Sequence, residues 1–386
     1  MKNYKTLLAE AQPWIEETFR KMDKKLSVMT VRSRDKLADG VGADGFHKEK
    51  ELPWWTCGFW GGLNHLMYIR TGNEDYLKTA RRSEERLDAA FHMVDELHHD
   101  VGFMWHILSG VNARLYGDKE SRNRNLLVAS YLSSRFILGG NFIRVWNNPK
   151  YGHTVENWTI IDCMLNLPLL YWASEEIGDD RFKRIAMAHA DSTLKCHIRP
   201  DGSVVHIVEH DRESGECVAT YGGQGCAEGS SWSRGQSWGV YGFVLSYLHT
   251  KEERYLDAAK RVANYFIANC CDDWLPRVDF RASAEPVMYD ASAGACAACG
   301  MIELAKILPE NEGGMYMHAA LRILQAMTEK FVDFDPNNDT LLGYSTARFP
   351  VNGDWKWAEV HTSLIYGDYF YTEAMCKLSG MDFLPW

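Results

Sequence analysis

The stretch Thr71-Gly-Asn-Glu-Asp-Tyr-Leu-Lys-Thr-Ala80 decides the fold, because similar stretches recur along the chain. The clearest copies are Ile177-Gly-Asp-Asp-Arg-Phe-Lys-Arg-Ile-Ala186 and Thr250-Lys-Glu-Glu-Arg-Tyr-Leu-Asp-Ala-Ala259, and weaker copies begin near Tyr116 and Asn311. Each copy ends one helical pattern of apolar residues and begins the next. A recurring helix–turn–helix unit predicts a solenoid or a closed ring of helical hairpins. A closed ring would bring distant segments together at one mouth.

Two kinds of helical pattern alternate along the chain. Patterns that carry many charges start near Thr6, Asp75, Lys119, Asp180, Lys251 and Gly314. Patterns rich in Gly, Ala and aromatic residues, with few charges, start near Gly58, Val101, Thr159, Gly235, Ser292 and Ser363. A helix that is apolar on nearly all sides is buried. The alternation therefore predicts an all-α double ring, with six helices outside and six inside.

Length and composition favour a single catalytic domain over residues 1–386. The chain is 46% hydrophobic and contains no Pro/Gly/Ser-rich linker. Residues 1–10 lack the apolar stretch of a signal peptide, and no run reaches the roughly 18 apolar residues of a membrane span. The net charge is −10, without a basic stripe, so we expect neither a membrane nor a nucleic-acid partner. The sequence does not indicate an oligomeric state.

The ten cysteines predict reduced thiols in a cytoplasmic protein. Cys296-Ala-Ala-Cys299 has the spacing of a redox or metal-binding pair, but no second pair stands at ligand spacing. The pair lies in an Ala-rich helical run, where a free cysteine behaves as a small hydrophobic residue, so packing is the favoured interpretation. Zinc motifs, phosphate loops and dinucleotide fingerprints are absent from the sequence, and we expect no metal and no cofactor.

The polar residues of the inner helices cluster where these helices begin. In a ring of parallel inner helices all six starts face one end, so Trp, His, Asp and Arg side chains would line the mouth. Helix N-termini favour negative charge, which predicts a pocket for an anionic ligand that stacks on aromatic rings. Two segments could overhang this mouth: a strand-like stretch at 202–209 with the loop 212–231, and the segment 335–362.

The mouth offers four candidate carboxylates, which are Asp100, Asp162, Asp290 and Glu228. Paired carboxylates in an aromatic groove are typical of glycoside cleavage. Asp162 stands out because the stretch 158–170 around it is otherwise apolar, and an apolar environment keeps a carboxyl group protonated, as a proton donor needs. A helix cap or a buried, satisfied carboxylate is an equally weighted alternative for Asp162. For Asp100, which follows two histidines, an N-cap is the stronger alternative.

Other side chains could bind the ligand. Arg234 lies between Trp232 and Trp238, and its guanidinium suits a substrate carboxylate; its alternative is a structural ion pair with Glu228 or Asp290. His99 and His206 could also bind a carboxylate, although a single histidine is more often structural. Sugar stacking is a further possibility for three tryptophans, each of which has a core role as its alternative. These are Trp55, Trp146 and Trp238.

Five motifs, in family order, make the chain similar to glycoside hydrolase family 88, the unsaturated glucuronyl hydrolases. They are Trp54-Trp-Thr-Cys-Gly-Phe-Trp-Gly-Gly62, Leu97-His-His-Asp-Val-Gly-Phe103, Ile160-Ile-Asp-Cys-Met-Leu-Asn-Leu-Pro-Leu-Leu170, Ser231-Trp-Ser-Arg-Gly-Gln-Ser-Trp-Gly239 and Tyr366-Gly-Asp-Tyr-Phe-Tyr371. The resemblance implies a six-hairpin (α/α)6 barrel without a metal. It also implies that Asp162 is the general acid and base and that Asp100 is the second essential carboxylate. Residues that match the lining of the family's uronate pocket are Trp55, His99, Trp146, His206, Gln224, Arg234 and Trp238.

The resemblance further implies the chemistry. The substrates of this family are lyase-generated oligosaccharides that end in a 4,5-unsaturated uronate, and hydration of the C4=C5 vinyl ether releases the sugar. Two alternatives stay open, namely an unsaturated rhamnogalacturonyl hydrolase that acts on pectin fragments and a non-catalytic carbohydrate-binding toroid. Gly223 stands where some relatives have a histidine. Lys356, between two tryptophans, could meet a sulfate, although a solvated loop lysine is the stronger interpretation.

Overall fold

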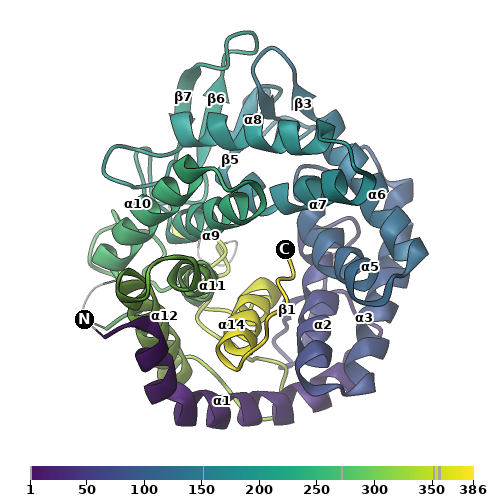
Figure 1. Ribbon diagram of the computed structural model, residues 1–386, viewed down its shortest axis with the longest axis vertical. Coiled ribbons are helices and arrows are strands. Elements are labelled where there is room, and N and C mark those ends of the chain that lie inside the picture. Colours follow the sequence, from purple (N-terminus) through teal and green to yellow (C-terminus); the bar gives the residue numbers. More distant parts are fainter. Residues whose placement is uncertain (1, 151, 271–272, 351–352, 355–357) are drawn as a thin grey trace.

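The computed structural model describes residues 2–150, 152–270, 273–350, 353–354 and 358–386, and its helices form two concentric rings (Figure 1). The outer ring consists of α1 (Tyr4–Arg32), α3 (Glu74–Leu87), α6 (Lys119–Ser134), α8 (Arg181–Cys196), α10 (Glu253–Asn269) and α12 (Glu310–Lys330). The inner ring consists of α2 (Phe59–Thr71), α4 (Val101–Trp105) with α5 (Val111–Tyr116), α7 (Leu167–Ile177), α9 (Ser233–Thr250), α11 (Ala291–Ile307) and α14 (Ile365–Leu378). The predicted all-α double ring is therefore confirmed.

Both rings close. In the inner ring, α14 packs against α2 on one side and α11 on the other, and in the outer ring α1 packs against α12. A π-helical turn, η3 (His106–Gly110), joins α4 to α5, so that this inner segment is continuous. Among the described residues, no helix combines the length and the apolar character needed to cross a membrane.

The repeated sequence motif forms the turns at the end of the barrel opposite to the inner-helix starts. In the first copy Gly72 ends α2 with a left-handed backbone (φ 70°), and the Asn73 side chain then caps α3 by accepting from the Asp75 N–H at 3.1 Å. Gly117 and Asp118 repeat this arrangement before α6. Because glycine adopts positive φ without strain and Asn or Asp caps a helix, the pair forms a compact hairpin turn.

Short strands lie around the mouth of the barrel. An antiparallel sheet joins β5 (Trp158–Ile160), β6 (Ile207–His210) and β7 (Cys217–Tyr221), and two hairpins pair β1 (Ala38–Val41) with β2 (His47–Glu49) and β3 (Phe136–Ile137) with β4 (Phe142–Ile143). The sequence predicted only one of these strands, at 202–209, and the observed β6 begins five residues later. The second strand, β7, lies inside the segment that we expected to be a loop.

Most helix starts agree with the predicted positions to within two residues, with two exceptions. Thr159 was expected to begin an inner helix, but it lies in β5, because its neighbours Trp158 and Ile160 favour strands and pair with β6. The inner segment begins instead with a 3₁₀ turn, η4 (Ile161–Leu165), and continues as α7. The helix start expected near Gly314 was predicted four residues too late, since α12 already begins at Glu310, directly after Pro309.

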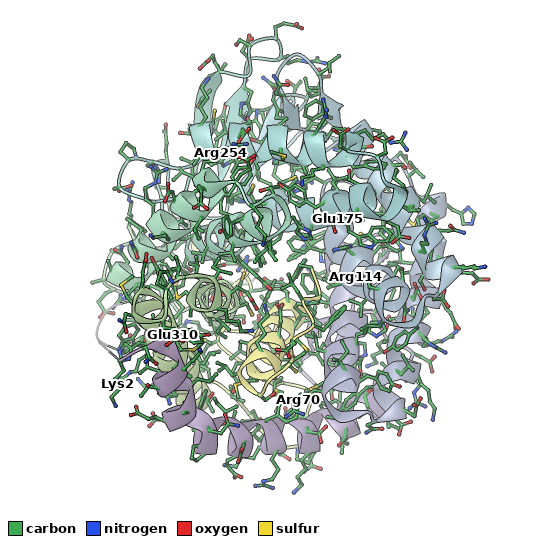
Figure 2. The ribbon with its side chains drawn as sticks, in the orientation of Figure 1. Lys2, Arg70, Arg114, Glu175, Arg254 and Glu310 are labelled. Carbon is green, nitrogen blue, oxygen red and sulfur yellow. The ribbon has the colours of Figure 1, made fainter. Side chains whose placement is uncertain are left out.

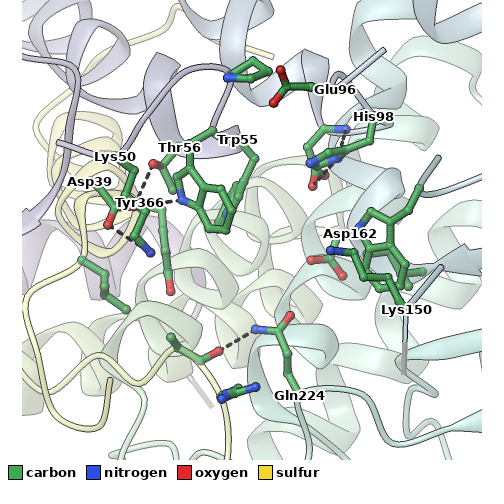
Figure 3. A pocket seen from close by; sticks show the side chains of 18 of the residues that line it. Asp39, Lys50, Trp55, Thr56, Glu96, His98, Lys150, Asp162, Gln224 and Tyr366 are labelled. Carbon is green, nitrogen blue, oxygen red and sulfur yellow. Dashed lines mark hydrogen bonds and ion pairs between the residues drawn. The ribbon is translucent and has the colours of Figure 1, made fainter. Parts of the chain in front are cut away.

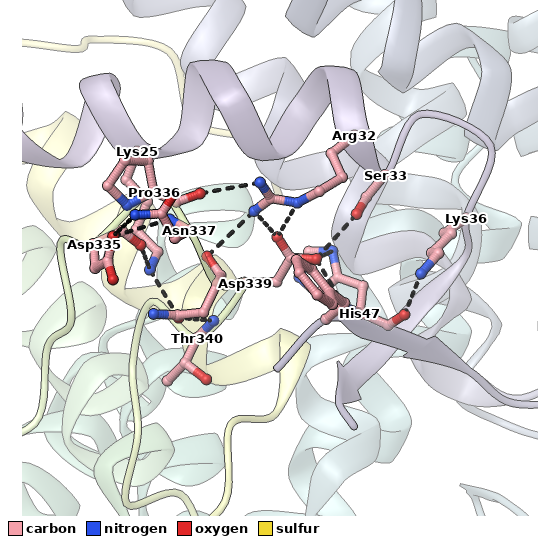
Figure 4. A network of polar contacts seen from close by, with 12 residues as sticks. Lys25, Arg32, Ser33, Lys36, His47, Asp335, Pro336, Asn337, Asp339 and Thr340 are labelled. Atoms are coloured by element: carbon pink, nitrogen blue, oxygen red, sulfur yellow. Dashed lines mark hydrogen bonds and ion pairs between the residues drawn. The ribbon is translucent and has the colours of Figure 1, made fainter. Parts of the chain in front are cut away.

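A buried polar network anchors the segment from 333 onwards to α1 (Figure 4). Asp339 accepts hydrogen bonds from the Arg32 guanidinium and from the His47 N–H, the latter at 2.8 Å. Lys25 in α1 donates to the carbonyl oxygen of Asp335 at 2.7 Å. These contacts fix the start of the second overhanging segment relative to α1 and β2, and the same segment supplies one wall of the cavity described below.

Candidate active site

A cavity of about 880 Å³ opens where the inner helices begin. The side chains around it come from the start of each inner segment and from the overhanging loops (Figure 3). Figure 3 shows Asp39, Trp55 and Thr56 on one side, with His98 and Asp162 opposite and Gln224 between them. The predicted pocket at the mouth is thus present, and its lining includes Trp55, Asp100, Trp146, Asp162, Gln224 and Arg234.

Asp162 lies in η4 at the floor of the cavity, with Ile161 and Cys163 beside it in the core. Its side chain is buried, and the Oδ2 atom has no hydrogen-bond partner among the described residues. Pairing of β5 with β6 brings His206 next to it, because the Ile161 N–H donates to the His206 carbonyl oxygen at 3.2 Å. The alternative of a fully satisfied structural carboxylate therefore does not fit Asp162.

His206 is held in one tautomer. The backbone N–H of Gln224 donates to Nδ1 at 3.0 Å, so a neutral imidazole carries its proton on Nε2. That Nε2 lies 3.5 Å from Asp162 Oδ2. Gly223 makes the arrangement possible, because its φ is 59° and a Cβ atom there would overlap the imidazole of His206. The glycine at this position is therefore required by the geometry of the site.

Asp100 precedes α4, but its side chain makes no capping hydrogen bond, so the N-cap interpretation is wrong. Its Oδ1 accepts from Asn166 Nδ2 at 3.0 Å and lies 3.3 Å from His99 Nε2, while Oδ2 lies 3.4 Å from His98 Nδ1. Burial alone would raise the pKa of Asp100, but His99, His98 and Asn166 together lower it. Asp100 is thus held as a carboxylate.

Arg234 pairs with Asp290, as one of its two alternatives predicted. The two side chains are buried and lie 2.6 Å apart, whereas Glu228 is exposed. The guanidinium is sandwiched between the rings of Trp232 and Tyr366, at 4.4 and 5.1 Å from their centroids. Arg234 also lines the cavity, so the ion pair does not remove it from the reach of a ligand.

The loops supply the remaining walls. Gln224 donates through its side chain to the Ala347 carbonyl oxygen at 2.6 Å and so links the two overhanging segments. Ala347 and Arg348 from the second segment line the cavity, as the sequence predicted for a lid. Trp55 packs beside Tyr366 with ring centroids 5.0 Å apart. Lys356, the candidate sulfate ligand, lies outside the described residues.

Three predicted binding residues do not face the cavity. Trp238 is 0% exposed and packs against Phe103 and Phe370, so it belongs to the core below the floor and the expected stacking on a sugar is not possible there. His99 and His206 are also buried, and they reach the site through Asp100 and Asp162. Arg234 lies in the first turn of α9, and Trp238 lies one turn further into the core on the same helix.

Comparison with known proteins decides the family. An unsaturated glucuronyl hydrolase of Bacillus sp. (strain GL1) is 35% identical over 332 residues, which cover 84% of this chain and 86% of the relative. The chain belongs to the unsaturated glucuronyl hydrolases. Members of this family are glycoside hydrolases, and the predicted six-hairpin (α/α)6 barrel and the hydrolase class are confirmed.

Two further relatives agree. An unsaturated chondroitin disaccharide hydrolase of Streptococcus pneumoniae (strain ATCC BAA-255 / R6) is 33% identical and covers 84% of this chain and 81% of its own length. The crystal structure of the Streptococcus agalactiae unsaturated glucuronyl hydrolase superposes with a TM-score of 0.87 at 27% identity, over 96% of this chain and 93% of that chain. A variant of the latter protein has been crystallised with dGlcA-GalNAc6S. No protein-family model matches the sequence.

Sequence reasoning missed a residue that positions Asp100. Asn166 donates to Asp100, and its Oδ1 accepts from the Phe103 N–H at 2.9 Å, so one amide connects the starts of two inner segments. The available signal was a single polar residue four positions after Asp162 in an otherwise apolar stretch. Tyr366 and His98, which line the cavity, were quoted within motifs but received no role.

Proposed function

We propose that this enzyme removes the 4,5-unsaturated uronate from the non-reducing end of lyase-generated glycosaminoglycan oligosaccharides. The observation that carries the proposal is the position of Asp162, a buried carboxyl group with an unpaired oxygen at the floor of a cavity that also exposes a guanidinium and indole rings. The names of the relatives support the substrate class, since they include chondroitin disaccharide hydrolases and a protein crystallised with dGlcA-GalNAc6S.

In the first step the Asp162 carboxyl group would donate its proton to C4 of the vinyl ether. Positive charge then develops at C5 and on the ring oxygen, where nearby carboxylates stabilise it. The Asp162 carboxylate next takes a proton from water as the water oxygen bonds to C5, so Asp162 is regenerated. The Nε2–H of His206, which faces Oδ2, stabilises this carboxylate form.

Collapse of the hydrated product breaks the glycosidic link. The hemiketal at C5 opens by cleavage of the bond between C5 and the ring oxygen, which leaves a ketone at C5. The hemiacetal at C1 then loses the aglycone as an alcohol, so one water molecule is consumed in total. Because the attack occurs at C5, the spacing of the two carboxylates does not report on inversion or retention at C1.

The remaining lining residues would bind the substrate. The Arg234 guanidinium would attract the uronate carboxylate, while Asp290 pairs with its Nη1 atom. Asp100, kept ionised by its neighbours, would accept from the ring hydroxyls. Trp55 and Trp146 supply apolar surfaces at the entrance.

We also propose one catalytic domain, no metal or cofactor requirement, and a cytoplasmic location. Cys296 and Cys299 are buried residues of α11. Their burial inside a helix supports the packing interpretation over a redox or metal-binding pair.

The proposal is tested with unsaturated disaccharides from chondroitin, hyaluronan, heparin and pectin, followed by the loss of their near-ultraviolet absorbance. We expect turnover of at least one glycosaminoglycan disaccharide and faster turnover than of the pectin fragment. Preference for the pectin fragment would support the rhamnogalacturonyl alternative. Binding of every disaccharide without loss of absorbance would support a carbohydrate-binding toroid.

A further inference from the structure

Three consecutive residues at the edge of the cavity place imidazole and carboxylate groups around one point. His98 Nδ1, His99 Nε2 and a carboxylate oxygen of Asp100 all lie within 4.8 Å of one another. Asp100 Oδ2 lies 3.4 Å from His98 Nδ1, and Asp100 Oδ1 lies 3.3 Å from His99 Nε2. Zinc bonds of about 2.0–2.1 Å in a tetrahedral site imply ligand atoms about 3.3–3.4 Å apart. Each imidazole therefore lies about one such edge from one oxygen of the Asp100 carboxylate.

The imidazole nitrogens of the cluster differ in their contacts. His98 Nδ1 accepts the Asp100 backbone N–H at 3.4 Å and also lies 3.4 Å from Asp100 Oδ2. Both ring nitrogens of His99 are buried without a hydrogen-bond partner among the described residues.

A support for the carboxylate is present as well. Asn166 donates to Asp100 Oδ1 at 3.0 Å and is itself fixed by the Phe103 N–H. Such outer contacts orient ligands and strengthen metal binding. His98 and Asp100 both line the cavity, so a fourth coordination position would face the bound sugar. The His98 side chain is the least buried of the three.

We propose that His98, His99 and Asp100 bind a divalent ion of the zinc class and that this ion inhibits the enzyme. Two imidazoles with one carboxylate suit Zn²⁺, Co²⁺ or Cu²⁺ better than Mg²⁺ or Ca²⁺, which prefer oxygen ligands. The bound ion takes the Asp100 carboxylate away from the sugar, so it competes with substrate. The inhibitory consequence rests on the proposed function, whereas the binding of the ion does not.

The binding is tested with Co²⁺ on protein first dialysed against a chelator. We expect one equivalent to give the visible absorbance of a tetrahedral Co²⁺ site without a thiolate charge-transfer band, which separates it from binding at the exposed Cys217. His98→Asn should weaken this binding about tenfold or more, and Asp100→Asn is a second variant that removes a ligand. His92→Asn makes the same change at an exposed histidine outside the cluster and should leave Co²⁺ binding unchanged.

The inhibition is tested separately with Zn²⁺. The dialysed wild-type enzyme should turn over the unsaturated disaccharide, and Zn²⁺ should raise the apparent KM without lowering kcat. Equal Co²⁺ affinity in wild type and His98→Asn would overturn the site, as would a thiolate band at the first equivalent. If no disaccharide in the panel is turned over, the proposed function fails, while the Co²⁺ titration still decides the metal site.

Discussion

At the far end of the barrel, Lys377 is buried but fully satisfied: it donates to Glu303 at 2.6 Å and to Tyr241 at 2.8 Å, and Glu373 lies 3.1 Å away. At the mouth, Asp162 Oδ2 and His206 Nε2 are just as buried and have no hydrogen-bond partner among the described residues. Both ends carry charge on inner helices. The difference indicates that the Lys377 charge at the far end stabilises the fold, whereas Asp162 Oδ2 and His206 Nε2 at the mouth are left to interact with a ligand.

The largest expected effect is on the chemistry at the mouth. Asp162→Asn should lower kcat by about 10²–10⁴-fold, because an amide cannot donate and recover the proton. Absorbance loss of the unsaturated disaccharide measures the rate, and an unchanged thermal transition shows that the fold is intact. Asp180→Asn, at an exposed position of the far end, is the matched control and should retain full activity. Turnover by Asp162→Asn at the wild-type rate would remove Asp162 from the proton transfer.

The next effect is on stability at the far end. Lys377→Met should lower the free energy of unfolding by about 3–5 kcal/mol, because Glu303 and Glu373 would be left buried without their cation. Lys306→Met is the control: Lys306 lies 3.6 Å from the same Glu303 but is more exposed, so its loss should cost less than about 1 kcal/mol. Denaturant unfolding measures both values. A similar loss for both variants would contradict the difference between the two ends.

The stability deficit of Lys377→Met should also depend on pH. Burial by itself would raise the pKa of Glu303, but Lys377 and Lys306 lower it. A lowered pKa in the folded state adds stability at neutral pH that is lost as the pH falls through that pKa. The deficit of Lys377→Met relative to wild type should therefore shrink in acid, and denaturant unfolding at several pH values checks it. A deficit that grows toward low pH would mean that the pair is not charged as described.

Arg234 allows a third test, because it forms a buried ion pair, as Lys377 does, and also lines the cavity. Arg234→Lys keeps a cation for Asp290 but loses the planar fork, so substrate binding should weaken by about 1.5–3 kcal/mol. The Michaelis constant and a thermal melt are measured together. An unchanged Michaelis constant with a lower melting temperature would restrict Arg234 to a structural role.

The smallest expected effect separates two tryptophans. Trp55→Leu should weaken substrate binding by about 0.5–1.5 kcal/mol, the value of one aromatic contact, and the Michaelis constant should rise accordingly. Trp238→Phe, below the floor of the cavity, should change stability but not the Michaelis constant. The reverse pattern would mean that the core ring, and not the ring at the entrance, contacts the sugar.

The fold was predictable because its signals are local and repeated. The Gly-Asn and Gly-Asp turns and the alternation of charged and charge-poor helices follow directly from helix capping and burial. The exceptions arise where tertiary pairing overrides local preference, as at Thr159, which pairs with Val208 in the sheet instead of starting a helix. That pairing depends on a strand almost fifty residues away, which no local pattern reveals.

The residue types of the site could be predicted from the sequence, but how deeply each side chain is buried could not. Asp162 stood out as a charge in an apolar stretch, and the structure places it on the cavity floor. Trp238 follows Arg234 by one helical turn, yet that turn separates the lining from the core. The hydrogen bond from Asn166 to Asp100 joins two inner segments, so neither local sequence could indicate it.

The C-terminal segment gives the cavity a further property. The C-terminus lies inside the ring of helices (Figure 1), where Trp386 is buried, stacks on Phe370 at an interplanar angle of 7° and donates to Glu373 at 3.0 Å. Arg114, labelled in Figure 2, donates to the adjoining backbone carbonyls. The C-terminal segment therefore closes the barrel below the cavity. A polysaccharide cannot thread through it, so only a chain terminus can reach the floor, and each released sugar must depart by the route along which it arrived.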